Sequence, residues 1–139
     1  MTDTVDPLTR RRIMRSIRGR DTKPELIVRK GLHARGFRYV LGGRRLPGRP
    51  DIVFPSRAIV IFVHGCFWHR HPDCKYAYVP ATRTDFWMEK FAENVRRDKV
   101  QQRKLEELGW RVMVVWECDL RKDSARVIRE LSARLSSQD

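Results

Sequence analysis

Residues 51–64 have the sequence DIVFPSRAIVIFVH, in which two apolar runs flank Pro55, Ser56 and Arg57. Short runs of β-branched and aromatic residues on either side of a turn are typical of a β-hairpin. Their almost continuous apolar character favours central strands that are buried on both faces of a sheet. We therefore expect this hairpin to form the core of a sheet that is covered by helices.

Helical patterns lie on both sides of the hairpin. Thr22 and Thr84 are expected to cap helices, and Gly109 is expected to end the longer one. The predicted helices span Thr9–Arg20, Thr22 to about Gly36, Thr84–Gly109 and Ser124–Leu135, and further strands span Phe37–Leu41 and Trp110–Trp116. This order predicts an α/β sandwich around a mixed sheet.

The chain has 139 residues, a length that predicts one domain, and it is strongly basic. Lys and Arg total 30 against 17 for Asp and Glu, which gives a net charge of +13. This excess favours a polyanionic partner, nucleic acid first and an anionic membrane surface second. No run reaches the roughly 18 apolar residues of a membrane span. Because the basic N-terminus lacks the apolar core of a signal peptide, we expect a cytoplasmic protein, with an organelle transit peptide as the alternative.

Three cysteines and a histidine have the spacing of a metal site. Cys66, His71 and Cys74 fall within nine residues, and Cys118 follows a predicted strand 44 positions later. Three thiolates and one imidazole form a closed tetrahedral set that is typical of structural zinc. The alternative is that the cysteines are ordinary small buried side chains.

A second group of residues suits hydrolytic chemistry. Asp51 opens an apolar strand and His64 ends the next one, with His69 close behind. An aspartate beside a main-chain carbonyl at a neighbouring strand end would suit Mg²⁺, and either histidine could act as a general base. The alternative is a strand-opening aspartate and a surface histidine with no catalytic role.

Two further acidic residues allow two interpretations each. Asp98 lies on the apolar stripe of the long predicted helix, where it would either orient a histidine or pair with a nearby arginine. Glu25 lies three residues after Thr22, which is a capping-box position as well as a candidate site position.

Aromatic residues flank the cysteine-rich segment. Phe67 and Trp68 lie inside it, and Phe86 and Trp87 begin the long helix. Such residues usually pack a loop, but in a DNA-binding protein they can insert between base steps, and mismatched steps open most easily. Arg83 and Lys75 would then contact phosphates.

Several blocks of the sequence match one known family in order. They are Arg12-Ile13-Met14-Arg15, Leu46-Pro47-Gly48-Arg49-Pro50-Asp51, His64-Gly65-Cys66-Phe67-Trp68-His69, Pro80-Ala81-Thr82-Arg83-Thr84 with Phe86-Trp87, Gly109-Trp110-Arg111-Val112 and Trp116-Glu117-Cys118. With these blocks, nearly the whole chain resembles the very short patch repair endonucleases, the Vsr family. The resemblance implies a restriction-endonuclease-like three-layer α/β sandwich, with a central mixed β-sheet flanked by helices and a structural zinc site. It also implies one domain over residues 1–139, in which residues 1–20 form a basic DNA-contacting helix.

The activity implied by this resemblance is strand-specific nicking of duplex DNA on the 5′ side of the thymine of a T:G mismatch. Such mismatches arise by deamination of 5-methylcytosine. By position, Asp51 resembles the Mg²⁺ ligand, assisted by the carbonyl of Val63, and His69 resembles the general base. The family's other active-site residues match His64, Asp98 and Glu25.

The resemblance also assigns binding residues. Phe67, Trp68 and Trp87 match an aromatic wedge in the major groove, and Met14 and Ile17 match a helix against the minor groove. The zinc ligands match Cys66, His71, Cys74 and Cys118. The segment from His71 to Cys74 is one residue longer than in a common form of the family, which leaves the path of this loop open.

Alternatives to this activity are a non-catalytic zinc-containing DNA-binding module and a nuclease of the same superfamily that cuts junctions or flaps. Charge alone would also allow an RNA-associated structural protein. We expect a monomer that acts on mismatched duplex DNA, with mismatch-repair proteins as further candidate partners, and we expect no membrane association.

Overall fold

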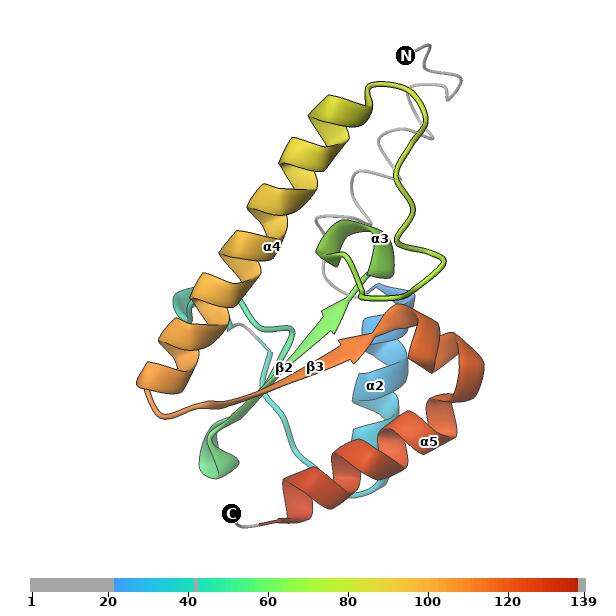
Figure 1. The fold of residues 1–139 in the computed structure, drawn as a ribbon. Helices are drawn as coiled ribbons and strands as arrows, with labels where there is room; N and C mark the ends of the chain where they lie inside the picture. The colour runs from blue at the N-terminus through green and yellow to red at the C-terminus, as the bar shows by residue number, and fades with distance from the viewer. Residues whose placement is uncertain (1–21, 42, 138–139) are drawn as a thin grey trace, which may run out of the picture.

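The computed structural model describes residues 22–41 and 43–137 (Figure 1). Its elements are α2 (Lys23–Ala34), η1 (Gly43–Arg45), β1 (Ile52–Phe54), η2 (Pro55–Arg57), β2 (Ile59–His64), α3 (Cys66–His69), α4 (Thr84–Glu107), β3 (Arg111–Trp116) and α5 (Glu117–Ser136). The predicted basic helix over Thr9–Arg20, with Met14 and Ile17, lies outside the described residues.

The described strands form a mixed three-stranded sheet in the order β1-β2-β3. β1 and β2 are antiparallel and joined through η2, which confirms the predicted hairpin, whereas β2 and β3 are parallel. All three residues of β1 are buried, as are all but one of β2. The mixed α/β character predicted from the sequence is therefore confirmed, although only β2 is central among the described strands.

The predicted strand over Phe37–Leu41 is wrong. Only Val40 pairs with the sheet, through one isolated antiparallel bridge to Val53. Its N–H donates to the Val53 carbonyl at 2.8 Å and its carbonyl accepts from the Val53 N–H at 3.1 Å. β1 is only three residues long, so it has few backbone groups with which a further strand could pair. The Phe37–Leu41 segment therefore makes one bridge and no strand.

Helices cover both faces of the sheet, which gives three layers (Figure 1). Alternate strand residues such as Ile61 and Met113 pack with Val28 of α2 and Leu131 of α5 in one core cluster. The intervening residues, such as Phe62, pack with Leu105 of α4 in a second cluster. Since side chains alternate along a strand, β2 carries one face toward α2 and α5 and the other toward α4.

The N-terminal ends of α4 and α5 differ from the predicted helix starts. Thr84 is the first residue of α4, and Arg83 takes the cap position with φ +54°. The Thr84 hydroxyl donates to the carbonyls of Pro80 and Ala81 at 3.3 Å and does not cap the helix. α5 begins seven residues before the predicted start at Ser124, and it is kinked at Asp123. The Asp123 carboxylate accepts from the Arg126 N–H at 3.1 Å, so it caps the part of α5 that the sequence predicted.

Candidate active site

Asp51 reaches the end of β2 because of the turn that precedes it. Gly48 has φ +74°, and a Cβ there would lie 2.9 Å from the Gln101 Cβ and 3.1 Å from the Phe62 ring. Only glycine therefore lets this loop pass so close to β2 and α4. The Asp51 Oδ2 then accepts a hydrogen bond of 2.7 Å from the Val63 N–H, which ties the carboxylate to the neighbouring strand.

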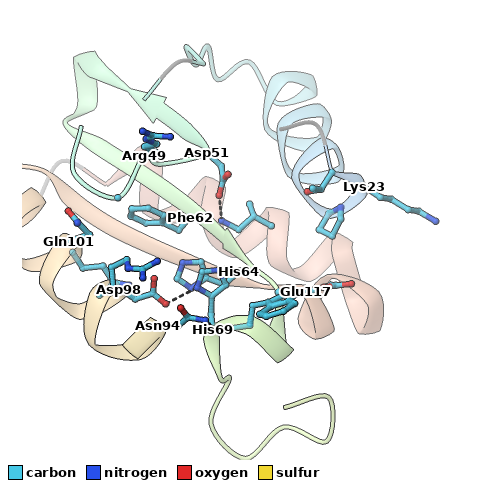
Figure 2. A pocket seen from close by; sticks show the side chains of 18 residues that line it. Lys23, Arg49, Asp51, Phe62, His64, His69, Asn94, Asp98, Gln101 and Glu117 are labelled. Atoms are coloured by element: carbon cyan, nitrogen blue, oxygen red, sulfur yellow. Dashed lines mark hydrogen bonds and ion pairs between the residues drawn. The ribbon is translucent and has the colours of Figure 1, made fainter. Parts of the chain in front are cut away.

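Two histidines and an aspartate lie beside Asp51. His64 ends β2, His69 ends α3, and their rings stack at 3.8 Å between centroids with an interplanar angle of 6°. The Nδ1 of His69 lies 2.7 Å from the Asp98 Oδ2 on α4 (Figure 2). Asp98 therefore holds a histidine, which was one of the two interpretations open from the sequence, and no ion pair between Asp98 and an arginine exists among the described residues.

Burial changes the protonation of this group. Desolvation raises the pKa of Asp51 from its ordinary 3.8 to about 6, a further rise comes from Glu25, and the Val63 N–H and His69 oppose both. Desolvation also lowers the pKa of His64 to about 4, so its ring is neutral near pH 7. A carboxylate held against such desolvation is a strong binding group for a cation, because a bound positive charge restores its ionised form.

These residues line one open cavity of about 650 Å³ between the sheet and α4 (Figure 2). It is lined by Asp51, Val63, His64, His69 and Asp98 together with Lys23, Arg49, Trp68, Asn94, Arg97, Gln101 and Glu117. A cavity with carboxylates, a hydrogen-bonded histidine and positive side chains can bind a cation and a phosphate together.

Glu25 lies behind this cavity. It is buried at 3% exposure in the first turn of α2, close enough to Asp51 to raise the pKa of that carboxyl. Its carboxylate lies 3.7 Å from the Arg29 guanidinium. The Thr22 side chain makes no capping hydrogen bond. The capping box that the sequence allowed, in which Thr22 and Glu25 would each bond to the other's main chain, is therefore not complete.

The four predicted metal ligands converge at the other side of α3. The donor atoms of Cys66, His71, Cys74 and Cys118 all lie within 4.8 Å of one another. The His71 Nδ1 is 3.7 Å from the Cys66 Sγ and 3.3 Å from the Cys118 Sγ. This group could therefore hold a metal ion, and the extra residue between His71 and Cys74 does not separate the ligands.

Aromatic residues form one cluster between α3 and the start of α4. The Phe67 ring centroid lies 5.1 Å from those of Trp68 and Phe91 and 5.9 Å from that of Trp87. Trp68 and Trp87 are 5.9 Å apart and both are half-buried. The predicted wedge residues are thus brought together, beside the cavity that Trp68 helps to line.

The two residues predicted to contact phosphates are both exposed. The Arg83 guanidinium lies 4.4 Å from the ring centroid of Phe86, which contacts Trp87 of the aromatic cluster. The Lys75 ammonium lies 5.1 Å from the Tyr76 ring centroid.

Comparison with known proteins identifies the relatives of this chain. Residues 2–76 match the family described as DNA mismatch endonuclease Vsr. "DNA mismatch endonuclease Vsr" of Escherichia coli strain K12 is 46% identical over 135 residues, which cover 97% of this chain and 86% of that protein. The chain belongs to the Vsr family.

Nicking enzymes are also among the relatives of this Vsr family member. "Type II nicking enzyme V.XorIIP" of Xanthomonas oryzae pv. oryzae is 48% identical over 120 residues, which cover 86% of this chain and 88% of that enzyme. "Type II nicking enzyme V.NmeAIP" of Neisseria meningitidis is 41% identical over 137 residues, which cover 94% and 97%.

The structure also adds residues that the sequence did not single out. Asn94 and Gln101 of α4 line the cavity beside Asp98. They lie four residues before and three residues after Asp98, so a polar stripe at helical spacing could have identified them. Arg70 had no comparable signal, because its hydrogen bonds are to main-chain carbonyls, which any residue type provides.

Arg70 fixes the loop of the aromatic cluster. Its guanidinium donates to the carbonyls of Phe67 at 3.1 Å, Ala77 at 2.6 Å and Tyr78 at 3.0 Å. It also lies 3.8 Å from the Phe91 ring centroid. Desolvation lowers the pKa of this guanidinium, which nevertheless stays charged because of its high ordinary value.

We expect Arg70→Ala to lower the free energy of unfolding by about 2 kcal/mol, since hydrogen bonds from charged groups contribute roughly 1.5–3 kcal/mol. Proteolysis of the segment 71–83 should become faster, because its two hydrogen bonds with Arg70, at the carbonyls of Ala77 and Tyr78, are lost. Thermal unfolding and limited proteolysis measure both effects. Arg97→Ala on the exposed face of α4 is the control, and equal behaviour of the two variants would contradict the role given to Arg70.

In the described residues, no helix combines the length and apolar character that a membrane span requires.

Proposed function

We propose that this protein is a DNA endonuclease that nicks one strand of a duplex on the 5′ side of the thymine of a T:G mismatch. One observation carries the proposal. Asp51, His64, His69 and Asp98 meet in a single cavity, in a chain whose relatives include a DNA mismatch endonuclease and nicking enzymes.

The catalytic roles follow from the hydrogen bonds in the cavity. Asp98 accepts from the Nδ1–H of His69, so the Nε2 of His69 carries the lone pair and can take a proton from water. His64 stacks on His69 and is neutral near pH 7, so it places no positive charge next to this base. His69 is therefore the general base of the proposed reaction, with Asp98 and His64 as its orienting partners.

Asp51 is the proposed ligand of a catalytic Mg²⁺. Its Oδ2 is bonded to the Val63 N–H, while the carbonyl of Val63 and the remaining Asp51 oxygen are the proposed main-chain and side-chain ligands. A bound Mg²⁺ would polarise the phosphodiester and lower the pKa of the attacking water. Glu25 contributes a second buried negative charge near Asp51, which favours a cation at this position.

Zinc is the proposed occupant of the cluster of three cysteines and one histidine. A tetrahedral zinc with Zn–S bonds of ~2.3 Å and Zn–N bonds of ~2.0 Å places sulfur and nitrogen ligands about 3.5 Å apart. The His71 Nδ1 lies 3.7 Å from the Cys66 sulfur and 3.3 Å from the Cys118 sulfur, close to that separation. Burial raises the pKa of the Cys66 thiol to about 12, so a cation is needed to hold it as thiolate at neutral pH. Four protein ligands leave no open position, which favours a structural role.

The aromatic cluster supplies the proposed recognition of the mismatch. Phe67, Trp68 and Trp87 form a compact apolar group at the cavity rim, with Arg83 beside it. Inserting such a group between bases requires unstacking, which is easiest at a mismatched step. Met14 and Ile17, in the minor-groove role proposed for the N-terminal helix, lie outside the described residues.

We expect Trp68→Ala to reduce the preference for mismatched over paired duplex by about tenfold. The reason is that the Trp68 ring no longer stacks on the bases that are unstacked at the mismatch. Affinity for fully paired DNA should change less. Competition binding with T:G and paired duplexes of one sequence measures the ratio, and Phe86→Ala serves as a control in the more exposed part of the cluster. Equal losses on both duplexes would contradict this role for Trp68.

Product mapping on a panel of substrates tests the proposed activity against its alternatives. The panel contains T:G and paired duplexes, a flap, a four-way junction and an RNA duplex, all in Mg²⁺. Cleavage confined to the T:G duplex supports the proposal. Cleavage of flaps or junctions instead would assign a structure-specific nuclease, and tight binding without any cleavage would assign a non-catalytic module.

A further inference from the structure

Trp116 lies between the metal cluster and the candidate catalytic histidines. On one side its ring stacks on His71 at 4.3 Å between centroids with an interplanar angle of 10°. On the other side it contacts the His64 ring edge to face at 5.3 Å and 72°. His64 in turn stacks on His69, which is bonded to Asp98. Four aromatic rings thus form a continuous series from the metal cluster to the catalytic base.

The backbone fixes the two ends of this series. His64 and Trp116 are direct partners in the parallel pairing of β2 and β3, so their side chains project from the same face of the sheet. The His71 N–H donates to the Cys66 carbonyl at 3.1 Å, and Cys118 follows Trp116 by two residues. The metal cluster therefore holds the segments on both sides of the Trp116 ring.

We propose that Trp116 is a positioning residue, which holds the His64 ring, and through it His69, in the orientation set by the Cys66–His71–Cys74–Cys118 cluster. His64 is 5% exposed, and among the described residues no hydrogen bond from its ring to another side chain is found. Its orientation therefore depends on packing against the rings of Phe62, His69 and Trp116. Of these three rings, Trp116 also stacks on the ring of His71, a residue of the metal cluster.

The test compares Trp116→Leu with Trp110→Leu. Trp110 precedes the opposite end of β3, is also half-buried and does not line the cavity, so its replacement removes the same volume away from the site. The kcat of Trp116→Leu is expected to fall about 10–100-fold, the range that small misplacement of a catalytic group produces, while KM and metal content stay unchanged. The kcat of Trp110→Leu should stay within about threefold of wild type.

A second measurement is independent of activity. The imidazole nitrogen signals of His64 and His69, recorded by NMR on the metal-loaded protein without DNA, should shift in Trp116→Leu and not in Trp110→Leu. Trp116→Phe keeps an aromatic ring, so it should restore part of the kcat and of the signals. Where Trp116→Leu does not fold, Trp116→Phe carries the test, because the smaller ring leaves the packing between His71 and His64 incomplete and should give intermediate values. Full wild-type values of both measurements in that variant overturn the inference.

The activity measurement rests on the proposed function, and the NMR measurement does not. A wild-type protein that nicks no duplex would contradict the proposed function alone. Imidazole signals and kcat that respond equally to Trp116→Leu and Trp110→Leu would overturn the role of Trp116 while leaving the proposed endonuclease in place.

Discussion

Asp51→Asn is expected to reduce the rate of nicking about 10³-fold, since stabilisation by a bound metal supplies several kcal/mol and ~1.4 kcal/mol corresponds to a tenfold change in rate. The amide has the shape of the carboxylate and can still accept the Val63 N–H, so the β1–β2 contact survives. What is lost is the negative charge that a hard cation requires. Affinity for mismatched DNA should change by less than about threefold, because the aromatic and basic contacts are intact.

The stability of this variant provides a second readout. Burial raises the pKa of Asp51 to about 6, so between pH 3.8 and 6 the folded state binds the proton more tightly than the unfolded state. The ionised carboxylate therefore destabilises the protein increasingly as the pH rises through that window, and fully above it. Without divalent cations, Asp51→Asn should be more stable than wild type at pH 8 and little different near pH 4.

Asp85→Asn is the control for this substitution. Asp85 is exposed in the first turn of α4, outside the cavity, so its replacement should leave both nicking and the pH dependence of stability unchanged. Single-turnover nicking and urea unfolding at the two pH values give the comparison. Full nicking activity in Asp51→Asn would contradict the metal-binding role assigned to Asp51.

Cys118→Ala is expected to abolish binding of the proposed zinc and to lower the melting temperature by roughly 10 °C or more, because a structural zinc contributes directly to folding. Cys118 lies in the first turn of α5, whereas Cys66 opens α3 and Cys74 lies in the loop that follows it. Loss of one ligand therefore releases the contact between the end of β3 and that loop.

Ser132→Ala is the matched control on the same helix. Ser132 is buried, and its hydroxyl donates to the Ile128 carbonyl at 2.7 Å, so its loss removes a hydrogen bond but no metal ligand. This variant should keep its metal and lose about 1 kcal/mol at most. Metal analysis and thermal unfolding test the pair. Unchanged metal content together with an unchanged melting temperature in Cys118→Ala would exclude the proposed metal site.

The sequence was sufficient to predict the β1–β2 hairpin, because apolar runs on both sides of Pro55 leave few alternatives to paired buried strands. The long helix and the strand after it were equally well marked, by periodicity and by Gly109 as a helix stop, and Gly109 has φ +96° in the structure. The Phe37–Leu41 segment was predicted wrongly, since apolar residues that pack a core from a loop give the same sequence pattern as a short strand.

The candidate site was predictable as a set of residue types but not as a geometry. The convergence of Cys118 with Cys66 depends on the parallel pairing of β2 with β3, which no local pattern specifies. The choice between a histidine and an arginine as the partner of Asp98 depended on how α4 crosses α3. Arg70 acts through main-chain carbonyls, which carry no sequence signal.

The proposed endonuclease activity is tested most directly by a strand-resolved nicking assay on end-labelled duplexes. Wild type and Asp51→Asn are each incubated with a T:G duplex and its fully paired counterpart, with and without Mg²⁺. We expect one Mg²⁺-dependent break, 5′ to the mismatched thymine, made by wild type alone. Binding without cleavage by wild type would contradict the endonuclease, and equal cleavage of both duplexes would contradict mismatch recognition.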